Sequence, residues 1–237
     1  MIPVILRDMR WRLLLLFGVA VTFYAAEPGF HQHDDFSLEA VGLGPLGISA
    51  TLSHFAAISM IVLLGGSLST DRREGYTRLF FSHPTSPLGY YGLRWSIADV
   101  IAVTGALLFL VLGQVIAWGA VFGGFRGLIL PAISALVYGG IMAILSVLVP
   151  RGEAWIASLL LVVPIFTPQL LTAILAPLHP GLRQGVMALL PPQAALARVW
   201  DGLLLGDLAW GAALFAAVYG VLLLAAAVAI LRLREWP

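Results

Sequence analysis

The sequence predicts an all-α membrane protein with six transmembrane helices, on the evidence of its composition, its apolar segments and its arginine distribution. Of the 237 residues, 60% are hydrophobic and only 11% are charged, and the mean hydropathy is +0.98. This composition excludes an ordinary soluble domain. Long apolar segments separated by short polar ones predict a chain that crosses the bilayer repeatedly. We therefore expect residues 1–237 to form a single transmembrane domain.

The N-terminal segment combines arginines with apolar side chains at helical spacing. Residues 1–12 are expected to form an amphipathic helix in the membrane interface, with the arginines extended toward water. Residues 13–26 carry no charge, but they are shorter than the ~20 residues that cross a bilayer. A cleaved signal peptide also fits an arginine-rich start and a short apolar core. Trp11 and the amphipathic turn around it favour an uncleaved first span.

Five further apolar segments follow, and their interruptions are informative. They are expected at residues 47–68, 97–122, 128–149, from 154 onward, and 208–231. His54 lies in the second span, and Pro164 and Pro168 interrupt the fifth, where proline breaks helical hydrogen bonding. Since polar or broken positions inside spans mark pathways, these three are candidate pathway residues.

Residues 176–207 are too charged and too rich in proline to cross the membrane. They predict short re-entrant or interfacial helices at 182–190 and 194–205, on the outer side, before the last span. Asp99 is the acidic residue expected inside a span. Because it lies near the same membrane face as Arg94, we expect an ion pair with Arg94 or another loop arginine.

Residues 69–95 form the longest charged interval between apolar segments. Asp71 is expected to cap a short helix that begins near Arg72, with Glu74 three residues later completing a capping box. Pro84 should end that helix. Ser86 should cap the next one, with Pro87 at its first position.

The short helix is predicted to be amphipathic. Tyr76, Leu79, Phe80 and His83 share one face, while Glu74 and Arg78 are one turn apart on another. A stiff helix of this kind suits a subunit that receives force from a soluble partner. An ordinary basic cytoplasmic loop is the alternative.

This interval resembles the coupling region of type-2 ABC transporter permeases. The resemblance is carried by Arg73-Glu74-Gly75, by the apolar residues 79–81 and by Pro84-Thr85-Ser86. It departs from the family pattern at Tyr76, which precedes Thr77, and in having aromatic residues where leucines are usual. The six-span plan, with a proline-rich re-entry before a final span, extends the resemblance over nearly the whole chain.

The resemblance implies a permease subunit of an ATP-driven exporter, working by alternating access as a homodimer or heterodimer. ATP and Mg²⁺ would bind separate ATPase subunits, since the chain contains no lysine for a phosphate-binding loop. The substrate is expected to be hydrophobic or amphipathic because the spans contain few charges. The implied ATPase-subunit interface comprises Arg72, Arg73, Glu74, Gly75, Tyr76, Arg78, Leu79, Phe80 and His83.

The arginines are distributed unequally across the predicted topology. Ten are expected on one side, namely Arg7, Arg10, Arg12, Arg72, Arg73, Arg78, Arg94, Arg151, Arg232 and Arg234. The other side receives Arg126, Arg183 and Arg198. By the positive-inside rule both termini and residues 69–95 are cytoplasmic. We expect a multi-pass protein of the cell (inner) membrane, with the lipid bilayer and no nucleic acid among its partners.

Several alternatives remain open at the level of sequence. A haem-exporter permease of cytochrome c maturation has a similar length and span plan. A rhomboid-like serine protease would use Ser49 as nucleophile, but His54 lies on the same helix. A non-catalytic scaffold or receptor is a third class. We expect no enzyme and no metal site, although the loop from His31 to Asp35 contains potential ligands.

Overall fold

The computed structural model describes residues 2–26, 48–73, 87–119, 121, 124–149, 151–166 and 175–235. These residues form helices joined by short turns, with no strand among them. In chain order the helices are α1 (Ile2–Ala26), α2 (Ile48–Leu64), α3 (Ser67–Arg73), α5 (Pro87–Trp118), the 3₁₀ helix η2 (Gly124–Leu128), α6 (Ile129–Leu148), α7 (Glu153–Phe166), α9 (Pro180–Leu189), α10 (Gln193–Leu205) and α11 (Trp210–Glu235). The described part of the chain is therefore all-α, as expected.

Three helical stretches in this part of the chain are long and apolar enough to cross a membrane. They are Gly89–Ile116, Phe125–Leu148 and Trp210–Leu233. Two shorter apolar stretches, Ser49–Leu64 and Glu153–Val163, belong to α2 and α7. These helices indicate a membrane protein, and the count of six spans stays a prediction.

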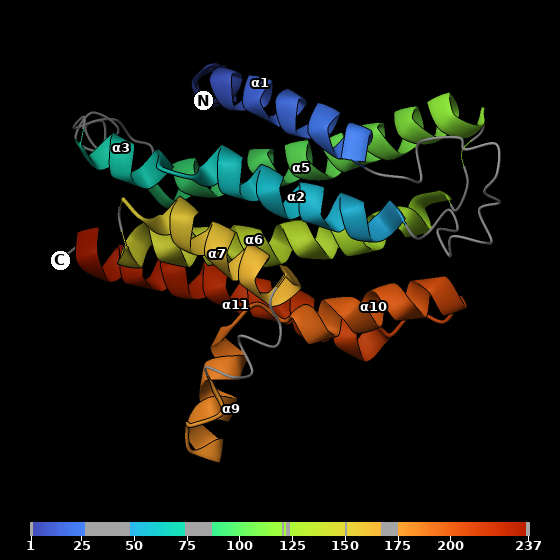
Figure 1. The fold of residues 1–237 in the computed structure, drawn as a ribbon. Helices are drawn as coiled ribbons and strands as arrows, with labels where there is room; N and C mark the ends of the chain where they lie inside the picture. The colour runs from blue at the N-terminus through green and yellow to red at the C-terminus, as the bar shows by residue number, and fades with distance from the viewer. Residues whose placement is uncertain are drawn as a thin grey trace.

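The long helices lie side by side in a bundle with α6 at its centre (Figure 1). Helix α6 packs against α2, α5, α7 and α11, while α1 covers α2 and α5. The N-terminal end of α1, helix α3 and the C-terminal end of α11 lie toward the same end of the bundle, and α9 projects away from it (Figure 1). The two chain ends are thus brought toward the same side.

Glycines allow the central helices to approach closely. A Cβ atom on Gly220 of α11 would lie 2.6 Å from the carbonyl oxygen of Leu136 in α6, and one on Gly140 would collide with the carbonyl of Gly220. On the next face of α6, a Cβ on Gly139 would lie 2.7 Å from Nε1 of Trp95. Small residues at such contacts let membrane helices pack backbone to backbone.

The N-terminal segment differs from the expected interfacial helix followed by a separate span. Helix α1 is continuous over 25 residues, from Ile2 to Ala26. No glycine or proline lies between residues 4 and 17 to break it, and Pro3 sits in the first turn, where a missing N–H costs nothing. The arginine-bearing turn and the apolar stretch are therefore one rigid element.

The helix expected over residues 47–68 ends earlier than expected, and Asp71 does not cap the helix that follows it. Helix α2 ends at Leu64 and α3 already begins at Ser67. Gly66 has φ +71°, a left-handed conformation that glycine adopts without strain and that ends a helix. Asp71 consequently lies inside α3 and is not an N-cap.

Other boundaries agree with the expected ones. Helix α5 begins at Pro87, and α6 covers residues 129–148. The proline-rich stretch contains two helices, α9 and α10, separated at residues 190–192. The side of the membrane on which they lie stays a prediction.

Candidate functional site: a polar cluster beneath α3

Charged and hydroxyl side chains gather at the end of the bundle that carries α3. We call this group the polar cluster. It comprises Asp8 and Arg12 of α1, Asp71 of α3, Tyr90, Tyr91 and Arg94 of α5, and Glu153 of α7. Arg94, Glu153 and Asp71 are only 2%, 2% and 7% exposed. Such deeply buried charges are costly unless they are paired, so their partners define the architecture of this end.

Arg94 joins α5 to α1. Its Nη2 donates to Oδ2 of Asp8 at 2.5 Å, and its Nη1 donates to the hydroxyl of Tyr90 at 3.4 Å. Asp99, the expected partner, does not pair with Arg94, and its pairing with another loop arginine stays a prediction because the side chains of residues 72–86 are not described. Residues five apart on a helix point about 140° away from each other, so one helix cannot bring these two side chains together.

Arg12 joins α1 to the end of α2. Its Nη1 donates to the carbonyl oxygens of Leu63 at 2.6 Å and Val62 at 3.4 Å. These carbonyls belong to the last turn of α2, where a cation satisfies unpaired acceptors and complements the helix dipole. Burial lowers the pKa of Arg12, but an arginine begins from so high a pKa that it stays protonated at neutral pH.

Glu153 joins the α2–α3 turn to α7. Its Oε1 accepts from the backbone N–H of Gly66 at 2.9 Å, and its Oε2 accepts from the backbone N–H of Arg151 at 3.0 Å. A carboxylate in the first turn of α7 also complements that helix dipole. Arg151 has φ +88°, a strained conformation for a non-glycine residue, and the bond to Glu153 helps to hold it there.

Asp71 fastens the other end of α3. Its Oδ2 accepts a hydrogen bond of 3.3 Å from the hydroxyl of Tyr91 in α5. Helix α3 is thus held to α7 through the turn before it and to α5 through its own side chain. Since α3 ends at Arg73, the polar cluster fixes the element that leads directly into residues 74–86.

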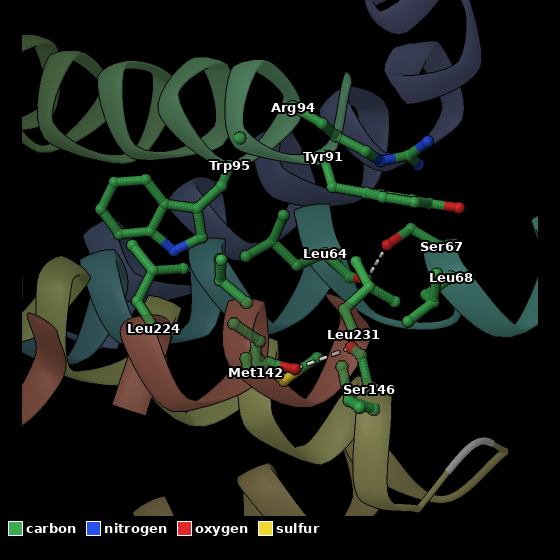
Figure 2. A pocket seen from close by; sticks show the side chains of 15 residues that line it. Leu64, Ser67, Leu68, Tyr91, Arg94, Trp95, Met142, Ser146, Leu224 and Leu231 are labelled. Carbon is green, nitrogen blue, oxygen red and sulfur yellow. Dashed lines mark hydrogen bonds between the residues drawn. The ribbon is translucent and has the colours of Figure 1, made fainter. Parts of the chain in front are cut away.

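A small apolar cavity lies beside the polar cluster (Figure 2). Its volume is about 90 Å³, and its walls come from α2, α3, α5, α6 and α11. Leu68 of α3 and Leu231 of α11 face it together with Trp95 and Ser146 (Figure 2). Pockets that enclose a drug-sized ligand measure ~300–1,000 Å³. The cavity is therefore unfilled space between helices rather than a complete substrate site.

Most of the residues expected to contact an ATPase subunit lie outside the described part of the chain. Arg72 and Arg73 are the last residues of α3, and their side chains are not described. Glu74, Gly75, Tyr76, Arg78, Leu79, Phe80 and His83 all fall in residues 74–86, outside the described ranges. The amphipathic helix predicted from residue 72 therefore stays a prediction.

Two of the candidate pathway residues lie on different helices, and the third lies outside the described residues. His54 is half-buried in α2, Pro164 lies in α7, and Pro168 falls outside the described residues. Ser49, the conceivable protease nucleophile, has a buried Oγ with no hydrogen-bond partner in the described part of the chain. It is therefore not paired with a histidine base as a serine nucleophile requires.

A second polar contact lies deeper in the bundle. The side-chain amide of Gln193, at the start of α10, donates to the hydroxyl of Tyr138 at 2.8 Å. That hydroxyl donates to the carbonyl oxygen of Leu160 in α7 at 3.4 Å. Because Tyr138 lies midway along α6, this contact fixes the first turn of α10 beside the middle of a spanning helix.

Sequence reasoning missed the members of the polar cluster that lie outside residues 69–95, namely Asp8, Arg12 and Glu153. A signal for them was present. Asp8 and Glu153 are acidic residues placed among arginines at the ends of apolar segments, on the side to which ten arginines were assigned. Acidic side chains in that setting are candidates for structural ion pairs or helix-end contacts.

Comparisons with known proteins add no assignment. No protein-family model matches the chain, and neither the curated proteins nor the solved structures give a significant match. Among the described residues, no three histidine, aspartate or glutamate side chains come together as metal ligands. The loop from His31 to Asp35 lies outside those residues.

Proposed function

We propose that this chain is the membrane-spanning permease subunit of an ATP-driven ABC exporter. The observation that carries the proposal is the way α3 is anchored. The helix that enters residues 74–86 is bonded to α5 through Asp71 and to α7 through Gly66 and Glu153. An ordinary surface loop does not require buried charged residues to fix the helix that precedes it.

The anchoring provides a route for force. In the proposed mechanism an ATPase subunit binds residues 72–83 and displaces them when it binds and hydrolyses ATP. The bonds of Asp71 and Glu153 transmit this displacement from α3 to α5 and α7, while Arg94 and Arg12 connect α5 and α2 to α1. Rigid elements joined by polar contacts are the kind of network that carries such coupling.

The cavity beside the cluster supports the same mechanism. It lies beside Leu68 of α3 and Leu231 of α11, which belong to one buried apolar cluster in a region where the helices otherwise pack closely. Since a close-packed interior resists displacement, unfilled space at this place gives α3 room to shift against α11.

The remaining parts of the proposal come from charge and composition. The arginine asymmetry favours a cytoplasmic position for residues 69–95 and both termini, on the side where ATPase subunits are found. Low charge in the apolar helices favours a hydrophobic or amphipathic substrate. A pathway between two permease subunits is proposed, in a homodimer or a heterodimer, with ATP and Mg²⁺ on the partner ATPases.

The proposal is tested by truncating the apolar face of residues 72–83. Phe80→Ala should weaken association with the ATPase subunit by about 2 kcal/mol, because buried aromatic side chains dominate interface energies. Arg78→Ala should cost less and should depend on salt, since a rim charge is screened. Binding is measured by titrating the ATPase onto the permease in nanodiscs at two salt concentrations.

Both variants should insert and purify like the parent. Tyr76→Ala, on the same apolar face, is measured alongside them. If Phe80→Ala and Tyr76→Ala bind the ATPase and support transport as well as the parent does, residues 72–83 are an ordinary loop. The proposal would then lose its coupling element.

A further inference from the structure

An open apolar groove runs between α1 and α5, and α2 forms its floor. Its volume is about 460 Å³. Leu13, Phe17 and Tyr24 line it on α1, Leu108 and Ile116 on α5, and Phe55 of α2 beneath them. Phe17 and Ile116 are 70% and 68% exposed. In a bilayer such a groove is filled by hydrocarbon or by another protein.

The groove is at least as long as the hydrocarbon part of one membrane leaflet. At 1.5 Å per residue, the rise from Leu13 to Tyr24 along α1 is roughly 16 Å, and the rise from Ile101 to Ile116 along α5 is roughly 22 Å. The hydrocarbon core of a bilayer is about 30 Å thick, so one leaflet accounts for about 15 Å. The groove is therefore long enough for a single lipid tail that begins at the arginine-bearing end of α1.

A polar hollow of about 430 Å³ lies at that end, and Arg7, Arg10 and Trp11 are among the residues that line it. Arg10 is one helical turn before Leu13, the first α1 residue of the groove, and its guanidinium lies 5.5 Å from the centre of the Trp11 ring. Tryptophan and arginine together are typical of the membrane–water interface.

The charge of the hollow favours an anion. Two carboxylates also line it. The charge of Asp8 is offset by Arg94, whereas Asp71 accepts from the neutral hydroxyl of Tyr91 and keeps its charge, so the two arginines leave one positive charge in excess. Arg7 and Arg10 are both exposed. Arginine binds phosphate oxygens through charge-assisted hydrogen bonds, and basic sites beside cytoplasmic helix ends bind anionic lipid head groups.

We propose that α1 and α5 hold one anionic phospholipid, with an acyl tail in the groove and the phosphate between Arg7 and Arg10. The site requires only that the chain lies in a membrane. It does not rest on the proposed exporter function, so failure of either proposal leaves the other unaffected.

The test is lipid retention after reconstitution into vesicles of phosphatidylglycerol and phosphatidylcholine in equal amounts. The full chain is extracted in mild detergent, and the lipids that remain bound are quantified by mass spectrometry. The parent should retain phosphatidylglycerol preferentially. Arg7→Gln and Arg10→Gln should each lower the retained ratio about fivefold, since one arginine near an anionic surface contributes on that scale. Arg232→Gln, an exposed arginine at the end of α11, should leave the ratio unchanged.

A second variant tests whether an acyl tail occupies the groove. Ala20→Trp fills the groove and should reduce the retention of both lipids while the preference for phosphatidylglycerol persists. Equal retention of the two lipids by the parent, or an unchanged ratio in Arg7→Gln/Arg10→Gln, would overturn the site.

Because the chain has no cysteine, Phe17→Cys gives a further check. Efficient disulfide formation between two copies through this residue would show the groove to be a protein interface and would also overturn the proposal.

Discussion

Gly220→Leu should be among the most damaging single substitutions in the bundle, lowering the free energy of unfolding by about 3 kcal/mol. A side chain on Gly220 meets the backbone of Leu136, starting with a Cβ only 2.6 Å from its carbonyl oxygen. A flexible side chain could rotate away, but a helix backbone cannot, so α11 must separate from α6. The contact between α6 and α11 is among the most extensive between any two helices described.

Gly211→Leu is the matched control, because Gly211 lies on the same helix and a Cβ there meets no atom within 4 Å. Unfolding of both variants is followed by circular dichroism in mixed micelles of increasing SDS fraction. Equal midpoints for the two leucine variants would show that α6 and α11 do not pack through these glycines.

Asp8→Ala should cost about 2 kcal/mol of stability, because it leaves the guanidinium of Arg94 buried without its partner. Arg94 is 2% exposed, whereas the side chain of Asp8 is 52% exposed. The loss should therefore be smaller than the roughly 3–5 kcal/mol typical of a fully buried pair, since water can reach the position that the carboxylate vacates.

The double variant Asp8→Ala/Arg94→Met distinguishes a lost attraction from an unpaired charge. Removing both charges and retaining an apolar side chain of similar length should return the stability to within about 1 kcal/mol of the parent. Asp201→Ala, an exposed aspartate on α10, serves as the control and should have no measurable effect. If Asp8→Ala/Arg94→Met is less stable than Asp8→Ala alone, Arg94 contributes mainly through its packing and its contact with Tyr90.

The helices that the sequence predicted most closely are those with a local physical signal. Pro87 begins α5 because proline is suited to the first turn of a helix. Helix α6 is bounded by polar or glycine-rich turns, so both of its ends could be predicted from the sequence. The helix start expected near Arg72 was wrong because Asp71 was taken as its N-cap. The chain instead turns at Gly66, whose left-handed conformation ends α2, and α3 begins directly after it.

The polar cluster could not be predicted in the same way because its contacts join distant parts of the chain. Asp8 and Arg94 are 86 residues apart, and Gly66 and Glu153 are 87 residues apart. Helical periodicity identifies which residues share a face, but it does not identify which face of another helix they meet. The sequence did indicate the kind of side chain involved, namely buried charges at helix ends, but not the partners.

The central claim, that this chain is the membrane half of an ATP-driven exporter, is tested most directly by isolating it from its native membranes. The tagged full-length chain is extracted in mild detergent, and the proteins that remain bound are identified and assayed for ATP hydrolysis. We predict that an ATPase subunit copurifies in a stoichiometric amount and that Phe80→Ala releases it while Arg232→Gln does not. A folded, membrane-inserted chain that purifies free of any nucleotide-binding subunit would contradict the claim.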